Sequence, residues 1–276
     1  MVSPFQRQRF ELKYILDEAR TSNIRDFLRP YLELDAYGAL QPDRSYSVHS
    51  LYLDSPDLTL HQSTINGDRN RFKLRVRYYE DDPDRPVFFE IKRREDNTIF
   101  KERCPVRRSS ASEILAGRLP SRTDLAYDGR PAEERALHDF CQQVNSLRAR
   151  PVAHVRYRRE AWHGLGDTRI RVTMDRQVRS CPETRSSLCT QLSEEAISVF
   201  GNAVVLELKF TNRFPEWMAE MVRVFGLRPC SAAKYVDGIL GMEDQQIILT
   251  NPTHAQLRNT AERRKLKQIQ FVRQGQ

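Results

Sequence analysis

Residues 71–78 read RFKLRVRY, and this stretch decides the fold. Its four basic residues alternate with apolar ones, which is the period-two pattern of a β-strand with one charged and one apolar face. The same alternation recurs in residues 9–14, 88–94, 99–104, 169–174 and 205–210. Two less regular segments, 46–53 and 152–162, also predict strands, and turn signals such as 66–68 and 81–84 separate the runs.

Eight strands with short links predict an antiparallel barrel or sandwich. Helices are expected at 17–29, from Ser55-Pro56-Asp57 to about Ile65, at 132–147 and at 215–225. Asp17 is the expected cap of the first helix, and Ser55 with Pro56 the expected start of the second. Residues 111–131 and 177–200 are expected to be loops or weak helix. We predict an α+β fold over residues 1–250, with an eight-stranded antiparallel barrel flanked by helices.

Residues 251–276 form a polar, basic tail beyond this domain. Two interpretations remain open for it. It is a mobile or peripheral helical segment, or it docks on an acidic partner.

The charge of the chain gathers on one face of the predicted strands. The whole chain has a net charge of +8, from 45 Lys and Arg against 37 Asp and Glu. The polar faces of the six regular strands alone carry thirteen basic residues and three glutamates, whereas the opposite faces are almost entirely apolar. Cations two residues apart on a strand lie ~6.6 Å apart and repel by roughly 2.5 kcal/mol at an effective dielectric of about 20. A solvated polar face normally mixes both signs, so we expect an anion to occupy this one.

The positions of the aromatic residues distinguish between possible anions. Sheet proteins that bind RNA place aromatic rings among the basic residues so that bases stack on them. Here Phe10, Phe72, Phe89 and Phe100 fall on the apolar faces. We therefore expect a bare phosphate chain and no direct contact with nucleic acid. Glutamates among the cations can hold Mg²⁺ or Mn²⁺, which bridges phosphate oxygens.

Other function classes have no motif in the sequence. It contains no P-loop, no dinucleotide-binding glycine motif after a strand, no protein kinase motif and no zinc-ligand spacing. Because no run of about 18 apolar residues occurs and the first residues have no apolar core, we expect neither a transmembrane helix nor a secretory signal. The five cysteines form no C-x-x-C pair, which predicts reduced thiols and a cytoplasmic location.

Several motifs resemble one known family. The stretch Ser50-Leu51-Tyr52-Leu53-Asp54-Ser55-Pro56-Asp57, followed by Lys73-x-Arg75-x-Arg77-x-Tyr79, is similar to the VTC (vacuolar transporter chaperone) polyphosphate polymerase domain. That domain belongs to the triphosphate tunnel metalloenzyme (CYTH-like) superfamily. Further motifs follow in the family's order: residues 10–14 (FELKY), 89–92 (FEIK), 101–103 (KER), 207–209 (ELK) and 231–235 (SAAKY). The resemblance covers about residues 5–240.

The resemblance implies an eight-stranded tunnel with a charged interior, ATP and polyphosphate as ligands, and a need for Mn²⁺ or Mg²⁺. It implies catalytic roles for Lys13, Arg75, Arg77, Lys92, Arg159 and Lys234. It implies phosphate binding by Lys73, Lys101, Tyr157, Arg171 and Lys209. It implies metal binding by Glu207, Glu11 and Glu90. For Glu11 and Glu90, a buried ion pair that positions neighbouring lysines is an equally good interpretation.

The strand at 152–162 is ambiguous from its pattern alone. Either Arg156 and Arg158 face the tunnel, or Tyr157 and Arg159 do. The family pattern Tyr-x-Arg-x-Ala-aromatic matches residues 157–162, which favours Tyr157 and Arg159 inside.

One departure from the superfamily bears on the reaction. Hydrolytic members carry Glu-x-Glu-x-Lys on the first strand, whereas this chain has Arg9, Glu11 and Lys13. Losing the first glutamate disfavours hydrolysis and favours transfer of the ATP γ-phosphoryl group to a growing polyphosphate chain. The alternatives are a triphosphate hydrolase of the same fold and a non-catalytic polyphosphate or nucleotide sensor. Because family members are often tied to membrane partners that move the product, a translocation partner at a membrane is also expected.

Overall fold

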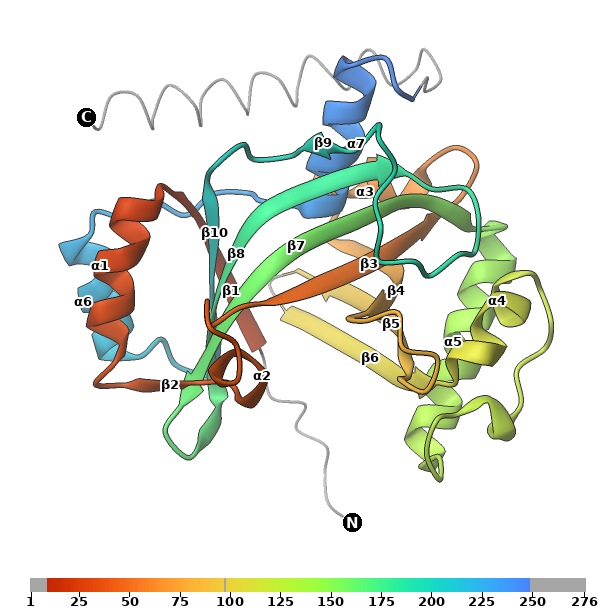
Figure 1. The fold of residues 1–276 in the computed structure, drawn as a ribbon, viewed down its shortest axis with the longest axis horizontal. Coiled ribbons are helices and arrows are strands. Elements are labelled where there is room, and N and C mark those ends of the chain that lie inside the picture. Colours follow the sequence, from red (N-terminus) through yellow and green to blue (C-terminus); the bar gives the residue numbers. More distant parts are fainter. Residues whose placement is uncertain (1–8, 97, 249–276) are drawn as a thin grey trace.

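A computed structural model describes residues 9–96 and 98–248. Its centre is an antiparallel sheet (Figure 1) with the strand order β1-β10-β8-β7-β3-β4-β5-β6. These strands are β1 (Arg9–Leu16), β3 (Tyr46–Asp54), β4 (Asn70–Tyr78), β5 (Val87–Glu95), β6 (Thr98–Val106), β7 (Arg150–Gly164), β8 (Asp167–Pro182) and β10 (Val204–Thr211). Each of the eight predicted strands is present, which confirms the α+β class. Two short strands, β2 (Leu32–Leu34) and β9 (Ile197–Ser198), pair with β7 and β8.

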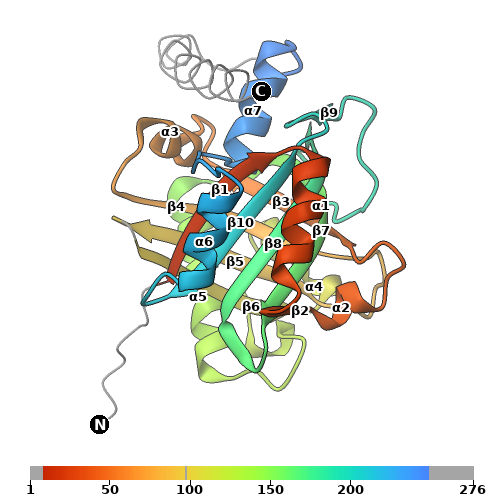
Figure 2. The same ribbon diagram turned by 90° about the vertical axis from the view of Figure 1, so that its left-hand side faces the viewer.

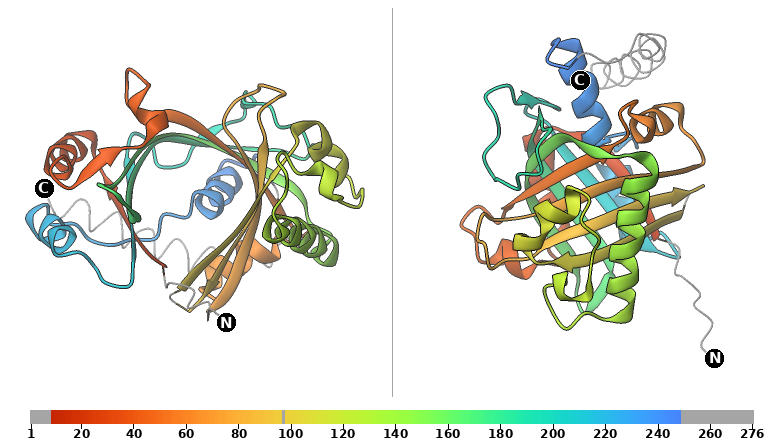
Figure 3. Two further views of the ribbon diagram at one scale, coloured as in Figure 1. Left: turned by 90° about the horizontal axis from the view of Figure 1, so that it is seen from below. Right: turned by 90° about the vertical axis from the view of Figure 1, so that its right-hand side faces the viewer.

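The sheet curls into a tunnel-like shape (Figure 3), but it does not close, so the prediction of a closed barrel is wrong. A barrel needs backbone pairing between its first and last strands. Within the described chain, β1 pairs only with β10 and β6 only with β5. Side chains connect this region instead, because Lys92 Nζ of β5 lies 2.9 Å from Glu11 Oε2 of β1. Where a closed barrel would have backbone hydrogen bonds between its first and last strands, this sheet has ion pairs between long side chains.

Three helices form where the sequence predicts them. They are α1 (Glu18–Leu28), α5 (Pro131–Leu147) and α6 (Glu216–Val224). Asp17 caps α1 as expected, since its carboxylate accepts a hydrogen bond from the backbone of Arg20 at 2.6 Å.

The helix α3 (Thr59–Asn66) begins later than predicted. Ser55 and Pro56 precede it rather than start it. The Asp54 carboxylate accepts hydrogen bonds from the backbone N–H groups of Leu60 and His61, both at 2.9 Å, and Ser55 Oγ accepts one from Thr59. These side chains cap the free N–H groups of the first turn, so the helix starts at Thr59.

The two segments predicted as loops or weak helix are more ordered than expected. The first overlaps α4 (Arg108–Leu115) and holds a 3₁₀ turn (Arg122–Asp124), and the second holds the end of β8 and all of β9. Tertiary contacts that leave no sequence pattern hold the rest of the second segment. For example, the Tyr78 hydroxyl donates to the Cys189 carbonyl at 2.8 Å.

The apolar faces of the strands point outward and are covered by helices. On one side, α1 and α6 lie against β1, β10 and β8 (Figure 2), where Ile24 and Met218 pack against Leu206. On another side, α5 packs against β4–β6, with Phe140 against Phe89 at a ring distance of 4.8 Å. The outer core therefore leaves only the inner face for the charged residues.

The last described helix, α7 (Lys234–Asp244), lies inside the curve of the sheet at one end (Figures 1 and 3). Its residues Tyr235 and Ile239 pack with Tyr52 and Val155 of the inner face. This end of the inner space is therefore apolar and filled, and the charged side chains occupy the remainder.

All five cysteines are free, as predicted. No helix in the described part of the chain is long and apolar enough to cross a membrane. The predicted basic tail lies outside the described residues.

Gly238 lets α7 approach β8, and this contact gives a stability prediction. A Cβ atom at Gly238 would lie 2.6 Å from Ser180 Oγ and 2.9 Å from Ser180 Cβ. We expect Gly238→Ala to lower the free energy of unfolding by about 1–3 kcal/mol through overpacking, as measured by urea denaturation. In a Ser180→Gly background the same substitution should cost clearly less. Equal costs in both backgrounds would contradict the close contact.

Candidate functional site

Charged side chains meet across the inside of the curled sheet. The Glu11–Lys92 pair joins β1 to β5, and Arg77 Nη2 of β4 lies 3.2 Å from the Tyr157 hydroxyl of β7. Because these strands are not neighbours, their side chains reach each other only over the concave face. We call the charged residues of this face, with Lys234 of α7, the charged lining. It consists of Glu11, Lys13, Lys73, Arg75, Arg77, Glu90, Lys92, Lys101, Arg103, Arg159, Arg171, Asp175, Glu207, Lys209 and Lys234.

Every residue that the sequence predicts for the site belongs to this face. The alternation of β4 explains how this arises, because burial of Leu74 and Val76 in the outer core turns Arg75 and Arg77 inward. In β7, Tyr157 and Arg159 face inward. Arg158 lies on the other face, where Nη2 is 2.6 Å from an Asp43 carboxylate oxygen.

Glu207 is the centre of the lining. Its carboxylate oxygens lie 2.9 Å from Lys234 Nζ, 3.4 Å from Arg159 Nη2 and 3.7 Å from Lys13 Nζ, and it also pairs with Lys209. Burial opposes ionisation, yet these four cations together hold the pKa of Glu207 well below its ordinary value. The carboxylate is therefore an anion at neutral pH, shared by cations from four elements.

Glu90 neutralises a second group of cations. It is fully buried, with its oxygens 2.6 Å from Arg75 Nη2 and 2.7 Å from Lys101 Nζ, and Arg103 Nε lies 3.4 Å away. Despite burial, Arg75 and its neighbours hold the Glu90 pKa well below the ordinary range. Both of its oxygens are engaged by cations.

Two cations of the lining differ from these. Arg77 is only 7% exposed, its Nη2 donates to the neutral hydroxyl of Tyr157, and its buried Nε has no hydrogen-bond partner in the part of the chain that the structure describes; the nearby Glu90 carboxylate helps to stabilise its charge without a direct ion pair. Lys73 forms no ion pair within that part. Burial, with Lys13 and Lys92 nearby, lowers the pKa of Lys73 to about 7. Lys73 is half-buried, and a desolvated cation without an ion pair is costly, so this region is suited to receive an anion.

The alternation in the sequence also contained residues that we did not predict for the site. Asp175 lies one position beyond the predicted strand 169–174, on the parity of Arg171, and pairs with Arg159 at 2.7 Å and Lys234 at 2.6 Å. Arg103 was on the predicted charged face but was given no role. Continuing the alternation of the predicted strands by one or two residues beyond their ends would have placed Asp175 on the charged face.

With this geometry in view, the comparisons with known proteins identify the family. A family model of the VTC domain matches residues 8–242. The chain belongs to the VTC domain family. The predicted resemblance is thereby confirmed over nearly the predicted range.

Solved structures similar to this member of the VTC domain family include the following one. It is the crystal structure of a "putative adenylate cyclase" from Bacillus halodurans, with 12% sequence identity and a TM-score of 0.47, and the match covers 82% of this chain and 94% of that one. Comparison with curated proteins finds no match.

The carboxylates of the lining were tested as ligands for a divalent cation. Among residues 9–96 and 98–248, no three His, Cys, Asp or Glu side chains form a metal-binding group. Mg²⁺, however, is usually held by only one or two carboxylates together with substrate phosphates. Glu207 and Glu11 fit this smaller requirement, because the Lys13 ammonium lies 3.7 Å and 3.4 Å from them and so marks a cation position between two carboxylates.

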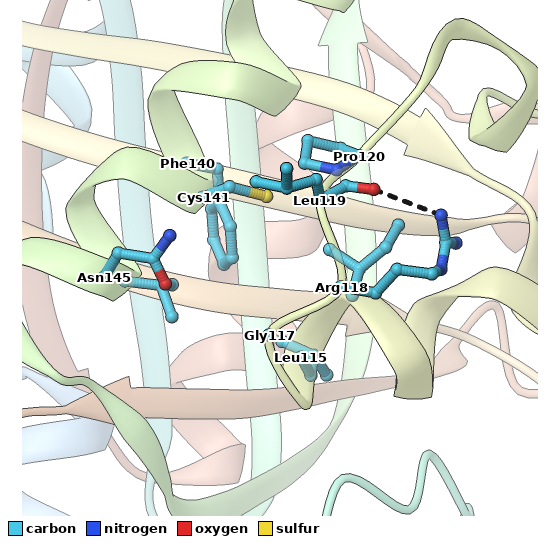
Figure 4. Close-up of a pocket in the computed structure, with 10 residues that line it drawn as sticks. Leu115, Gly117, Arg118, Leu119, Pro120, Phe140, Cys141 and Asn145 are labelled. Atoms are coloured by element: carbon cyan, nitrogen blue, oxygen red, sulfur yellow. Dashed lines mark hydrogen bonds between the residues drawn. The ribbon is translucent and has the colours of Figure 1, made fainter.

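Two cavities outside the lining are poor candidates for the site. The one between α4 and α5 (Figure 4) is lined by residues such as Leu119 and Phe140, and its volume of about 10 Å³ holds at most one water molecule. A larger one of about 280 Å³ lies outside β7 and β8. Its arginines are each paired with a carboxylate, for example Arg25 with Glu160 at 2.9 Å.

The lowered pKa of Lys73 predicts a pH dependence of anion binding. An anion beside Lys73 raises its pKa, so binding takes up a proton wherever the free lysine is neutral. Binding should therefore be favoured below the free pKa of about 7 and should weaken as pH rises through it. We expect the affinity advantage of the wild type over Lys73→Met for inorganic tripolyphosphate to fall roughly tenfold from pH 6 to pH 8.

Isothermal titration calorimetry measures this advantage. Taking the ratio of the two proteins removes the titration of tripolyphosphate itself, which is common to both. A ratio that stays constant with pH would refute the lowered pKa.

Proposed function

We propose that this VTC domain is an ATP-dependent polyphosphate polymerase, which transfers the γ-phosphoryl group of ATP to a growing polyphosphate chain. The observation that carries the proposal is Arg77, a buried guanidinium whose partner is a neutral hydroxyl. The charged lining has eleven lysines and arginines against four carboxylates, so the protein's own carboxylates leave positive charge on the concave face. Family membership supports phosphate as the anion that completes this region.

The remaining cations are suited to position and neutralise phosphates. Phosphoryl transfer needs little covalent work from a protein and depends mainly on alignment and charge. Arginines offer bidentate donors to phosphate oxygens, and lysines offer compact charge as it develops on the bridging oxygen. Arg75 and Lys101 are oriented by Glu90, and Arg159 and Lys234 by Asp175.

No general base is required for this reaction. The acceptor is a phosphate that is already ionised, so no proton has to leave it before attack. This agrees with the lining, where the carboxylates are engaged by cations. We therefore assign Glu90 and Asp175 to positioning.

Mg²⁺ or Mn²⁺ would be held by Glu207, with Glu11 as the second carboxylate. Such an ion supplies charge neutralisation and links phosphate oxygens when bound. The lysines around Glu207 hold that carboxylate ionised, which is the form that binds a metal.

The cellular setting stays a prediction. The cytoplasmic location rests on the cysteine pattern, and the membrane partner that moves the product is implied by the family. Both predictions concern parts of the protein outside the charged lining.

Incubation with ATP and Mn²⁺, followed by gel analysis for long phosphate chains, tests the proposed reaction. We expect chains from the wild type and none from Glu207→Gln, because the amide cannot provide the carboxylate charge for the cation. Circular dichroism and thermal unfolding must establish that the variant is folded. Release of free phosphate alone would favour a triphosphate hydrolase, and binding without turnover would favour a sensor. Full activity of Glu207→Gln would overturn its assignment as metal ligand.

Arg77 is tested separately by binding. Arg77→Met should weaken tripolyphosphate binding by about 1.5–3 kcal/mol, which is the usual worth of a hydrogen bond to a charged group. Arg158→Met is the matched control, because Arg158 lies two strands away in the sheet and points to the outer face. Calorimetry should find the control unchanged. Equal affinities for all three proteins would exclude Arg77 from the phosphate site.

A further inference from the structure

Four aromatic rings border the charged lining. Tyr46, Tyr79 and Phe88 follow one another across β3, β4 and β5, with ring centroids 6.2 Å and 6.1 Å apart. Tyr37 of α2 (Ala36–Ala39) extends the row, 6.0 Å from Tyr46. We call these four residues the aromatic rim.

The rim is continuous with the concave face. Tyr79 lies two residues beyond Arg77, and Phe88 pairs directly with Arg77 in the strand register. Tyr46 pairs with Arg159. A two-residue step is about 6.8 Å along an antiparallel strand, so each ring lies one such step, or one strand spacing, from a buried arginine. The rim is at the end of β3 opposite to the end where Asp54 contacts Tyr235 of α7.

Hydrogen bonds to Asp35 position the turn that carries Tyr37, the outermost ring of the rim. Asp35, the N-cap residue of α2, accepts hydrogen bonds from the Tyr46 hydroxyl at 2.9 Å and from Arg171 at 3.1 Å. It also accepts one from the backbone of Gly38 at 2.9 Å. These contacts fix the turn that carries Tyr37, whose side chain is nevertheless 72% exposed.

The rings of the rim do not stack on one another. Neighbouring rings of the rim are inclined by 57–75°, so none stacks flat on the next. The guanidinium of Arg103 lies 3.5 Å from the centre of the Phe88 ring. Aromatic rings and arginine planes of this kind are the surfaces on which nucleobases stack, and such stacking tolerates any base.

We propose that the aromatic rim binds the base of the nucleoside triphosphate while the charged lining binds its phosphates. This inference rests on the proposed function, because it assumes that a nucleotide is the phosphate donor. A neutral, flat base would gain nothing among buried cations and would leave them unpaired, whereas on the rim it covers the exposed ring of Tyr37. The nucleotide would therefore enter with its γ-phosphoryl group deepest, toward Arg75 and Lys234.

Tyr37→Ala tests the rim, because Tyr37 is exposed and its loss should not disturb the fold. The ligands are an ATP analogue with a β,γ-imido bridge, which cannot transfer its terminal phosphoryl group, and inorganic tripolyphosphate, both with Mg²⁺. We expect the variant to bind the ATP analogue roughly 5- to 150-fold more weakly, the range for losing one stacked base. Its affinity for tripolyphosphate should be unchanged.

Two further variants serve as controls. Tyr127→Ala removes another exposed tyrosine, 63% exposed and outside the rim, and should bind both ligands as the wild type does. Tyr37→Phe keeps a ring for stacking and should restore binding of the ATP analogue.

The outcomes separate this inference from the proposed function. If the wild type binds neither ligand, the proposed function fails. If it binds both and Tyr37→Ala weakens neither, or weakens both equally, the rim does not hold the base and the proposed function stands. Loss of binding of the ATP analogue alone supports the rim.

Discussion

The Glu207 carboxylate is the interaction on which the rest of the inner face depends. It is shared by Lys13 of β1, Arg159 of β7, Lys209 of β10 and Lys234 of α7. Each of these cations would be expensive to bury alone, and removing one partner of a buried pair typically costs several kcal/mol. A single buried carboxylate thus lets three strands and the plugging helix bring positive charge to one place. It also fixes the position of α7, whose first residue is Lys234.

The cations of the lining divide into two kinds. Those around Glu207 and Glu90 share these carboxylates in ion pairs. Arg77 is buried and Lys73 half-buried without a direct ion pair within the described chain, and desolvation lowers the pKa of Lys73 to about 7, as it lowers that of Lys101 beside Glu90 to about 6. Paired cations define the geometry, whereas unpaired ones supply the binding energy for an anion. This division explains how the fold tolerates so much positive charge before a ligand arrives.

Strand alternation made most of this arrangement predictable. The charged residues of RFKLRVRY lie on the opposite face of the strand from Leu74 and Val76. Because the apolar side packs into the outer core, the charged side had to be the inner face. The same rule, applied one residue beyond the predicted strand 169–174, would have included Asp175. That position was missed because strand ends are poorly marked in sequence.

Features that depend on contacts between residues far apart in the sequence could not be predicted from strand alternation. Whether two edge strands pair is decided by the geometry of the whole sheet, and no local pattern records it. The start of α3 depends on how the Asp54 carboxylate is oriented, and that carboxylate also accepts a hydrogen bond from Tyr235, which is far away in sequence. The contact between Gly238 and Ser180 likewise exists only because α7 returns to the inside of the curl.

The order of groups along the inner face has a physical consequence for a polyanion. At one end, beyond Lys234, the apolar residues of α7, β3 and β7 pack together and fill the space. In the middle, carboxylates hold the cations in place in a site that is already desolvated, so an entering phosphate exchanges one anionic partner for another instead of bearing the full cost of drying the site. At the other end of the inner face, the charged residues are followed by the four rings of the aromatic rim. A linear ligand with an anionic tail and a neutral flat head fits this order in one direction only, because in the reverse direction the neutral head would lie among the central cations and leave them unpaired.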